Sequence, residues 1–180
     1  MFFIESPRLR LIPLTNEQLQ LHIDDHSHLQ KTLGLLPQDL EMESFFQAEM
    51  DDAMVTYWLP QTSAHESDYQ WFTNWLIVLR AENRCVGGIG LAGLPNEKGE
   101  TEIGYGMDER YRGRGIAVEA LNCLVEWAFE HPHLTAIIAH TPADLLNSQR
   151  VLEKTDFELI KEEEGRMLLW RKGKISAKAR

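Results

Sequence analysis

The sequence predicts an α+β fold, a mixed α/β sandwich in which one central sheet is flanked by helices. Three observations support this prediction. Two strand-like segments flank a short turn at residues 82–84, as in an antiparallel hairpin. A strand–helix–strand–helix pattern follows over residues 101–154, and two strand-like segments around residues 164–165 form a final hairpin. One sheet with helices packed against it accommodates all three patterns.

Strands are expected where apolar and polar residues alternate, or where a continuous apolar run is short. By these criteria the predicted strands are residues 8–14, 75–81, 85–93, 101–107, 134–140, 157–162 and 166–172. Between the first two, residues 16–69 are polar and mostly helical in character, with breaks at Gly34, Pro37 and Pro60.

Two helices belong to the strand–helix pattern. The first begins after Arg114 and is expected to end near His131 and Pro132, because a proline disfavours helix at the residue before it. The second covers residues 147–154, with Asn147 as an N-capping residue. Apolar residues of the first helix recur at i, i+3 and i+4 and predict one buried face, made of Ala117, Ala120, Leu121, Leu124, Val125 and Ala128.

The composition is typical of a soluble single domain of 180 residues, with 43% hydrophobic and 26% charged residues. Its formal net charge of −10 argues against nucleic-acid binding and mildly favours cationic partners. Cys85 and Cys123 lie in apolar stretches, as reduced core residues do in a reducing compartment. Because neither a signal peptide nor an apolar run of about 18 residues is found, we expect a cytoplasmic protein without a membrane partner.

His22 and His26 are four residues apart and could share a helix face as metal ligands. Such polar stretches are more often solvated helix faces, so no metal is expected. A second motif, Gly88-x-Gly90-x-x-Gly93, matches a dinucleotide-binding fingerprint. A turn follows it where that fingerprint requires a helix, so we attribute these glycines to bulges or close packing within a strand.

Residues 112–117, "RGRGIA", have the context that the other glycine motif lacks, since a strand precedes them and an amphipathic helix follows. Glycines allow a tight turn and close approach of a ligand to the backbone. Free N–H groups at the helix N-terminus attract anions, and Arg112 and Arg114 add positive charge. The segment therefore predicts a site for a phosphate-bearing ligand, with a simple turn carrying solvated arginines as the alternative.

Residues 102–121, "EIGYGMDERYRGRGIAVEAL", resemble motif A of the GNAT superfamily of N-acetyltransferases, in which Q/R-x-x-G-x-G/A is filled here by Arg112, Gly115 and Ala117. "SQRVLEK" followed by Phe157 resembles a later motif of the family. "ESPRLRLIPLT" is similar to the opening of the Rim-type ribosomal-protein N-acetyltransferases. The resemblance implies one GNAT-like domain over residues 1–172, with a mostly antiparallel sheet of about six or seven strands, followed by a basic, frayed tail at residues 173–180.

The resemblance also implies acetyl-CoA as co-substrate and no metal. Its pyrophosphate would be held by the loop of Arg112, Gly113, Arg114, Gly115, Ile116 and Ala117, and its pantetheine arm by Tyr105, Gly106 and Met107. The sequence departs from the family pattern at three positions. Leu146 stands where an asparagine is usual, with Asn147 one place later as the candidate cofactor contact. Asp156 replaces a glycine, and Leu152 replaces the tyrosine that serves many relatives as general acid.

The implied reaction moves an acetyl group to a primary amine, which must lose a proton before it attacks the thioester. Glu102 is the candidate base, because alternation places it on the same face as Gly104 and Gly106. A solvent-facing carboxylate or a cross-strand partner is the alternative role for Glu102, and His140 is an alternative base. Ser148 is a candidate to protonate the departing thiolate, although helix capping is the simpler role.

The acceptor pocket is expected in the variable first third of the domain, which includes Tyr57, Trp58 and Trp71, although aromatic residues there are more often core than pocket. A protein N-terminus, a polyamine, an aminoglycoside-type amine and a small metabolite all remain open as acceptors. A non-catalytic CoA-binding regulatory module with the same fold is the alternative function, and a nucleotide-binding protein is a third. Nothing in the sequence predicts the oligomeric state.

Overall fold

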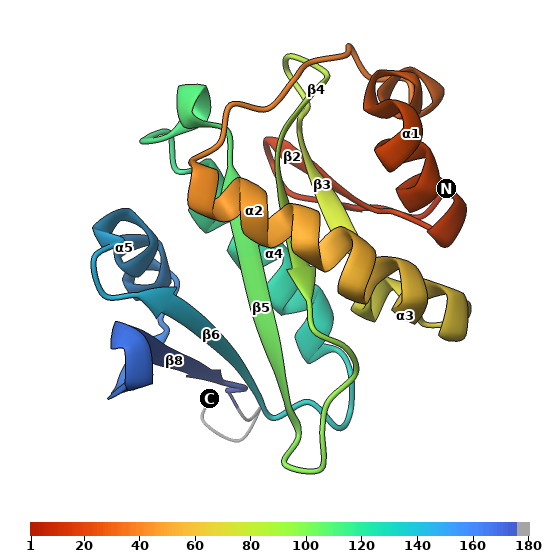
Figure 1. Ribbon diagram of the computed structural model, residues 1–180. Coiled ribbons are helices and arrows are strands. Elements are labelled where there is room, and N and C mark those ends of the chain that lie inside the picture. Colours follow the sequence, from red (N-terminus) through yellow and green to blue (C-terminus); the bar gives the residue numbers. More distant parts are fainter. Residues whose placement is uncertain (176–180) are drawn as a thin grey trace.

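A computed structural model describes residues 1–175 of the chain (Figure 1). Its eight strands form one sheet in the order β1-β2-β3-β4-β5-β6-β8-β7. The strands are β1 (Ile4–Glu5), β2 (Leu9–Pro13), β3 (Asn74–Leu79), β4 (Arg84–Leu91), β5 (Glu100–Met107), β6 (Ala136–Pro142), β7 (Glu158–Glu163) and β8 (Met167–Gly173). The predicted architecture is confirmed, with slightly more strands than the six or seven expected. The strand absent from the sequence prediction is β1, a short segment that pairs Ile4 with Leu11.

Helices cover both faces of the sheet, with α2 in front of β4 and β5 and α4 behind them (Figure 1). The α-helices are α1 (Asn16–Thr32), α2 (Ser44–Ala53), α3 (Leu59–Ala64), α4 (Ile116–Phe129) and α5 (Leu146–Lys154), with a π-helical turn at Met54–Trp58. Side chains of β3 alternate between the two layers. Trp75 and Ile77 pack in the α4 core, whereas Leu76 packs in the α1 core.

The buried face of α4 agrees with the predicted stripe, except that Ala117 is only half-buried. The predicted cap of α5 is wrong. That helix begins at Leu146, so its N-cap is Leu145, and no side chain caps it. Asn147 therefore lies within the first turn with its side chain exposed. Because the helix begins earlier than predicted, neither Asn147 nor Ser148 is at its N-cap.

Two further sequence predictions concern the glycine-rich strand and the tail. Gly88 and Gly90 lie within β4, where an added Cβ would meet Asn74 and the Thr73 carbonyl group, so close packing explains both glycines. The last strand ends at Gly173, and residues 176–180 of the predicted tail lie outside the described residues. No helix within residues 1–175 is long and apolar enough to cross a membrane.

Among the strands of residues 1–175, β5 and β6 form the single parallel pair, and they pair only over three residues. The register runs from Glu100 opposite Ala136 to Glu102 opposite Ile138, after which the two strands diverge (Figure 1). Beyond Glu102 the β6-facing edge of β5 is unpaired, so its backbone N–H and C=O groups are available to a ligand. The sheet is therefore open between β5 and β6 beyond this short pairing.

Candidate active site

Two cavities flank the gap between β5 and β6. The loop cavity, about 580 Å³, lies between the 112–117 loop and α5, and the sheet cavity, about 400 Å³, lies between α2 and the faces of β4 and β5. Phe46, Tyr105, Gly106 and Ser148 line both cavities. The two cavities therefore meet at the unpaired part of β5.

The loop cavity contains most of the residues predicted to bind the cofactor. Gly113 and Gly115 have φ values of +74° and +72°, in the left-handed region that favours glycine. Gly115 is the N-cap of α4, and the first turn of that helix leaves backbone N–H groups unpaired beside the cavity. The predicted residues that line it are Tyr105, Gly106, Met107, Arg112, Gly113, Gly115, Ile116, Ala117 and Asn147.

The two arginines of the loop have different surroundings. Arg112 lines the loop cavity, where its Nη1 is 2.8 Å from Oε1 of Glu43. Arg114 does not line the cavity, because its guanidinium group lies over the ring of Tyr111 and 3.9 Å from Glu82. Of these two arginines, therefore, only Arg112 is placed to contact a phosphate group in the loop cavity.

Arg150 and Lys154 also line the loop cavity, and sequence reasoning did not identify them. Both lie on α5, and residues 147, 150, 151 and 154 recur at the i, i+3, i+4, i+7 spacing that places them on one helix face. That periodicity is the sequence signal that could have placed Arg150 and Lys154 beside Asn147. With Arg112 they give the cavity three cationic side chains, although the formal charge of the chain is −10.

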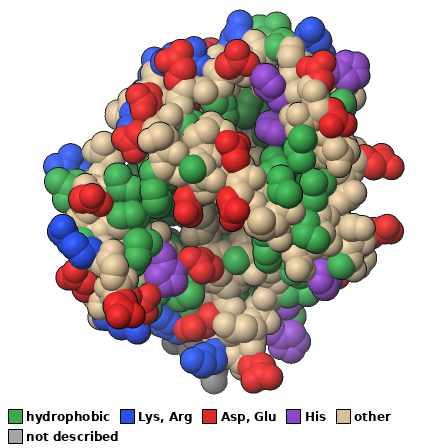
Figure 2. Space-filling view, viewed as in Figure 1, with side chains coloured by type: hydrophobic (Ala, Val, Ile, Leu, Met, Phe, Trp, Pro, Cys, Tyr) green, Lys and Arg blue, Asp and Glu red, His purple; other side chains and the backbone are tan. Residues whose placement is uncertain are grey.

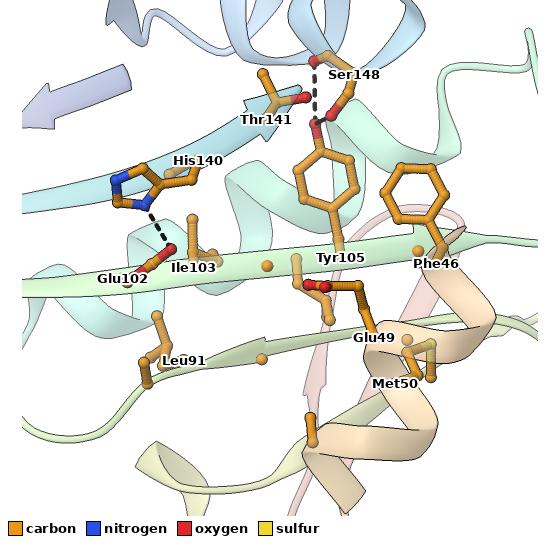
Figure 3. A pocket seen from close by; sticks show the side chains of 18 of the residues that line it. Phe46, Glu49, Met50, Leu91, Glu102, Ile103, Tyr105, His140, Thr141 and Ser148 are labelled. Carbon is orange, nitrogen blue, oxygen red and sulfur yellow. Dashed lines mark hydrogen bonds and ion pairs between the residues drawn. The ribbon is translucent and has the colours of Figure 1, made fainter. Parts of the chain in front are cut away.

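Tyr105 and Ser148 meet where the two cavities join (Figure 3). The Tyr105 hydroxyl oxygen is 3.1 Å from Oγ of Ser148 and donates to the Ser148 carbonyl group at the same distance. Burial raises the pKa of Tyr105 to about 12, so this phenol keeps its proton at neutral pH. Ser148 does not cap α5, because it lies within the helix, whose N-cap is Leu145. Its hydroxyl group instead contacts Tyr105.

Glu102 and His140 extend from adjacent strands into the sheet cavity (Figure 3). His140 Nδ1 is 2.7 Å from Oε1 of Glu102, and its Nε2 is 3.2 Å from Oε2 of Glu163. Glu163 is also hydrogen-bonded by Lys161, which holds the pKa of that carboxyl group below its usual value. The imidazole thus bridges two carboxylates. The two candidate bases, Glu102 and His140, form one hydrogen-bonded pair.

The floor of the sheet cavity is made of glycines. The register places Gly88 opposite Gly106 and Gly90 opposite Gly104, and all four residues line the cavity. As alternation predicted, Glu102 lies on the same side as Gly104 and Gly106. An added Cβ at Gly106 would collide with Met42, whereas one at Gly104 would meet no atom within 4 Å. Gly104 is therefore the open part of this floor, beside Glu102.

The roof of the sheet cavity is one face of α2 and the turn after it. Phe46, Glu49, Met50 and Ala53 recur at helical spacing and line the cavity, followed by Tyr57 and Trp58. Tyr57 and Trp58 thus line this cavity, and their role toward an acceptor stays a prediction. Trp71 does not line the cavity, because it is buried in the α4 core with its ring 5.0 Å from that of Trp127.

The two adjoining cavities bring together three sets of groups with different chemical properties. Backbone N–H groups and cationic side chains at one end can hold phosphate groups. The Glu102–His140 pair at the other end can accept a proton, and the Tyr105 and Ser148 hydroxyl groups between them can donate hydrogen bonds. Within residues 1–175 no group of three or more His, Cys, Asp or Glu side chains is arranged to hold a metal ion.

Comparisons with known proteins identify the family of the chain. Residues 8–158 match the family model described as the acetyltransferase (GNAT) domain. The chain is 39% identical over 88 residues to the uncharacterized N-acetyltransferase YjdG of Bacillus subtilis (strain 168), a match that covers 49% of this chain and 52% of YjdG. It is 34% identical over 82 residues to the probable N-acetyltransferase YjcK of the same bacterium, covering 45% of each protein. The matches thus span about half the length of these relatives.

The fold is also similar to a solved structure of RimL, a ribosomal L7/L12 alpha-N-protein acetyltransferase, in complex with coenzyme A. The TM-score is 0.64 at 16% sequence identity, covering 96% of this chain and 98% of that one. At this identity the likeness concerns the fold alone, while the family model spans most of the chain. The chain belongs to the GNAT acetyltransferase family.

Proposed function

We propose that this protein is an N-acetyltransferase that moves the acetyl group of acetyl-CoA to a primary amine. The observation that carries the proposal is the meeting of the two cavities at Tyr105 and Ser148. One cavity has the features of an anion site and the other presents a candidate base, so a donor and an acceptor can reach one reaction centre from opposite sides.

In this proposal the loop cavity holds the cofactor. The N–H groups around Gly113 and Gly115 and the guanidinium group of Arg112 bind the pyrophosphate, and Arg150 and Lys154 add charge. The pantetheine arm lies along the unpaired edge of β5 from Tyr105 to Met107. Its thioester then lies beside Ser148, and Asn147 contributes from the first turn of α5. The coenzyme A in the RimL structure supports this choice of ligand.

The Glu102–His140 pair is the proposed base. A protonated amine entering over Gly104 transfers one proton to this pair, and its lone pair then attacks the carbonyl carbon of the thioester. Backbone N–H groups near Gly106 and Met107 stabilise the oxyanion that forms. After the attack the nitrogen still carries one excess proton. When the C–S bond breaks, the nitrogen releases that proton and the sulfur takes up one through the hydroxyl groups of Ser148 and Tyr105. The products are one amide, one thiol and the proton held by the Glu102–His140 pair.

The acceptor is proposed to enter from the α2 side. Solved structures of similar fold include a ribosomal-protein-S5-alanine acetyltransferase from Vibrio fischeri and RimL, which supports a protein N-terminus as one candidate. We also propose a cytoplasmic location, because Cys85 and Cys123 are both free thiols, as expected in a reducing compartment.

The test is acetyl transfer to a panel of amines by the wild type and by Glu102→Gln and His140→Gln. Removal of a general base is expected to lower kcat/KM by about 10²–10⁴-fold while the acetyl-CoA affinity stays unchanged. Glu162→Gln, on the exposed surface of β7, is the matched control. Saturable acetyl-CoA binding without transfer to any amine would instead support a regulatory module.

A further inference from the structure

The sheet cavity contains a second carboxylate besides Glu102, the acidic member of the proposed base. Glu49 and Glu102 line it, and no Lys or Arg is among its lining residues within the described part of the chain. Figure 2 shows acidic side chains beside the hollow in this face of the molecule. Glu49 is directed from α2 into the cavity (Figure 3) and forms no ion pair with any residue of 1–175. A carboxylate in this position favours a cationic ligand.

A second, independent feature of the same cavity is the buried carboxamide of Asn74. Its side chain is 1% exposed, and its Oδ1 has no hydrogen-bond partner. Buried polar atoms without a partner are rare in folded proteins, so Oδ1 is an unpaired acceptor to which a hydrogen-bond donor of a ligand could bind. Oδ1 lies over Gly88 beside the methyl group of Met50, which is the end of a flexible side chain. A small shift of that methyl group gives a ligand in the cavity access to Oδ1.

The sheet register gives the position of Asn74 relative to the base. Asn74 on β3 is opposite Gly90 on β4, which is opposite Gly104 on β5. Two strand spacings of the sheet amount to about 10 Å, so Asn74 lies about that far across the floor from Gly104. Glu102 is two residues from Gly104 along β5. Glu102 and Asn74 therefore lie at opposite sides of the glycine floor, with α2 and Glu49 above it.

We propose that the acceptor carries a second cationic group besides the amine that is acetylated, and that Glu49 and Asn74 bind it. This inference rests on the proposed function. One amine lies at Glu102 and loses its proton there. The second stays protonated, pairs with the Glu49 carboxylate and donates a hydrogen bond to Asn74 Oδ1. The aromatic rings of Phe46, Tyr57 and Trp58 border the cavity and favour a cation by cation–π attraction.

Two kinds of acceptor carry an amine and a second cationic group: a short free polyamine, and a peptide with lysine or arginine near its N-terminus. The experiment therefore uses two matched pairs of acceptors. Putrescine is compared with butylamine, and a tetrapeptide with lysine as its second residue is compared with the same peptide carrying norleucine there. We expect kcat/KM to be about 10-fold higher for the dicationic member of the preferred pair, because charge-assisted hydrogen bonds are the strong ones.

The variant that tests the binding group is Glu49→Gln, with Asp51→Asn as its matched control. Asp51 loses the same charge on the same helix but does not line the cavity. Glu49→Gln is expected to abolish most of the preference for the dicationic acceptor, whereas Asp51→Asn retains it. Asn74→Ala is a second variant and should reduce the same preference. Calorimetric titration of putrescine or the lysine peptide, with coenzyme A present, measures the second-cation affinity without turnover.

Several outcomes would overturn the inference. If monocationic amines are acetylated as well as their dicationic partners, the proposed function stands and the second-cation site does not. The same conclusion follows if Glu49→Gln and Asp51→Asn have equal effects on the preference. If acetyl-CoA binds but no amine is acetylated, and neither putrescine nor the lysine peptide binds in the titration, the proposed function and the second-cation site both fail.

Discussion

Substitution of Gly104 is the simplest test of whether the two cavities bind different substrates. A Cβ added at Gly104 would meet no neighbour within 4 Å, and the φ of this residue is outside the left-handed region, so a side chain fits without backbone strain. Gly104→Leu places a branched side chain where the acceptor amine is proposed to enter. Because a displacement of about 1 Å can cost 100-fold in rate, kcat/KM for the acceptor should fall by roughly that factor.

Acetyl-CoA affinity is expected to be unchanged in Gly104→Leu, because Gly104 does not line the loop cavity. Steady-state kinetics with a calorimetric measurement of acetyl-CoA binding separates the two effects, and Gly104→Ala provides the milder control. A loss of cofactor affinity equal to the loss of acceptor kcat/KM would show that the cavities were assigned to the wrong substrates.

The sequence predicted the glycines of the loop better than those of the floor. Gly113 and Gly115 stand between a strand and a helix, a context in which a tight turn with positive φ is expected. Gly88 and Gly106 become neighbours only through the pairing of β4 with β5. The register of these two strands depends on the geometry of the turn that joins them, so sequence periodicity alone did not reveal a glycine floor. The sequence also did not reveal that Arg112 and Arg114 have different surroundings. Those surroundings depend on contacts with residues elsewhere in the chain, such as Glu43 and Glu82.

At the scale of elements, α2 connects the two cavities. Its N-cap residue Glu43 pairs with Arg112 in the loop cavity, Phe46 lines both cavities, and Glu49 lines the sheet cavity. A cofactor phosphate that binds Arg112 must compete with the Glu43 carboxylate. This ion pair therefore links the N-terminus of α2 to the loop cavity.

Glu43→Gln is expected to strengthen acetyl-CoA binding. Partly exposed ion pairs contribute about 0.2–1 kcal/mol, so the dissociation constant should fall by up to about 5-fold when the pair is removed. Calorimetry at fixed salt concentration measures the change, since screening alters such pairs. Glu41→Gln is the matched control, because Glu41 pairs with Arg110 and not with Arg112. Weaker acetyl-CoA binding in Glu43→Gln would show that Glu43 supports the cofactor site.

The helical character of residues 16–69 was predicted, but the role of α2 was not. No residue of α2 is buried, so its sequence lacks the strong apolar stripe that would reveal which face packs on the sheet. By contrast, five residues of the apolar stripe predicted for α4 are buried, and the stripe correctly identified the face of that helix that packs on the sheet. The start of α5 was misread because Asn147 is a favourable capping residue, while the structure begins the helix one residue earlier without any side-chain cap.

At the scale of the whole molecule, the site exists because one sheet changes from antiparallel to parallel pairing at β5 and β6. Only three residue pairs join these strands before they diverge, and helices cover the sheet on both faces. The divergence exposes the edge of β5 between the loop and the glycine floor. The sequence predicted both strands and the helix between them, but the short pairing and the gap follow from three-dimensional packing.

The claim that the loop cavity is a cofactor site is tested most directly by calorimetric titration of acetyl-CoA into the wild type, Arg112→Ala and Arg114→Ala. We predict saturable binding at one site in the wild type, weakened by about 10-fold or more in Arg112→Ala, because a charge-assisted contact to phosphate is lost. Arg114→Ala should bind nearly as well as the wild type, because Arg114 lies outside the cavity. No saturable binding at millimolar acetyl-CoA, or equal losses in the two variants, would contradict this assignment.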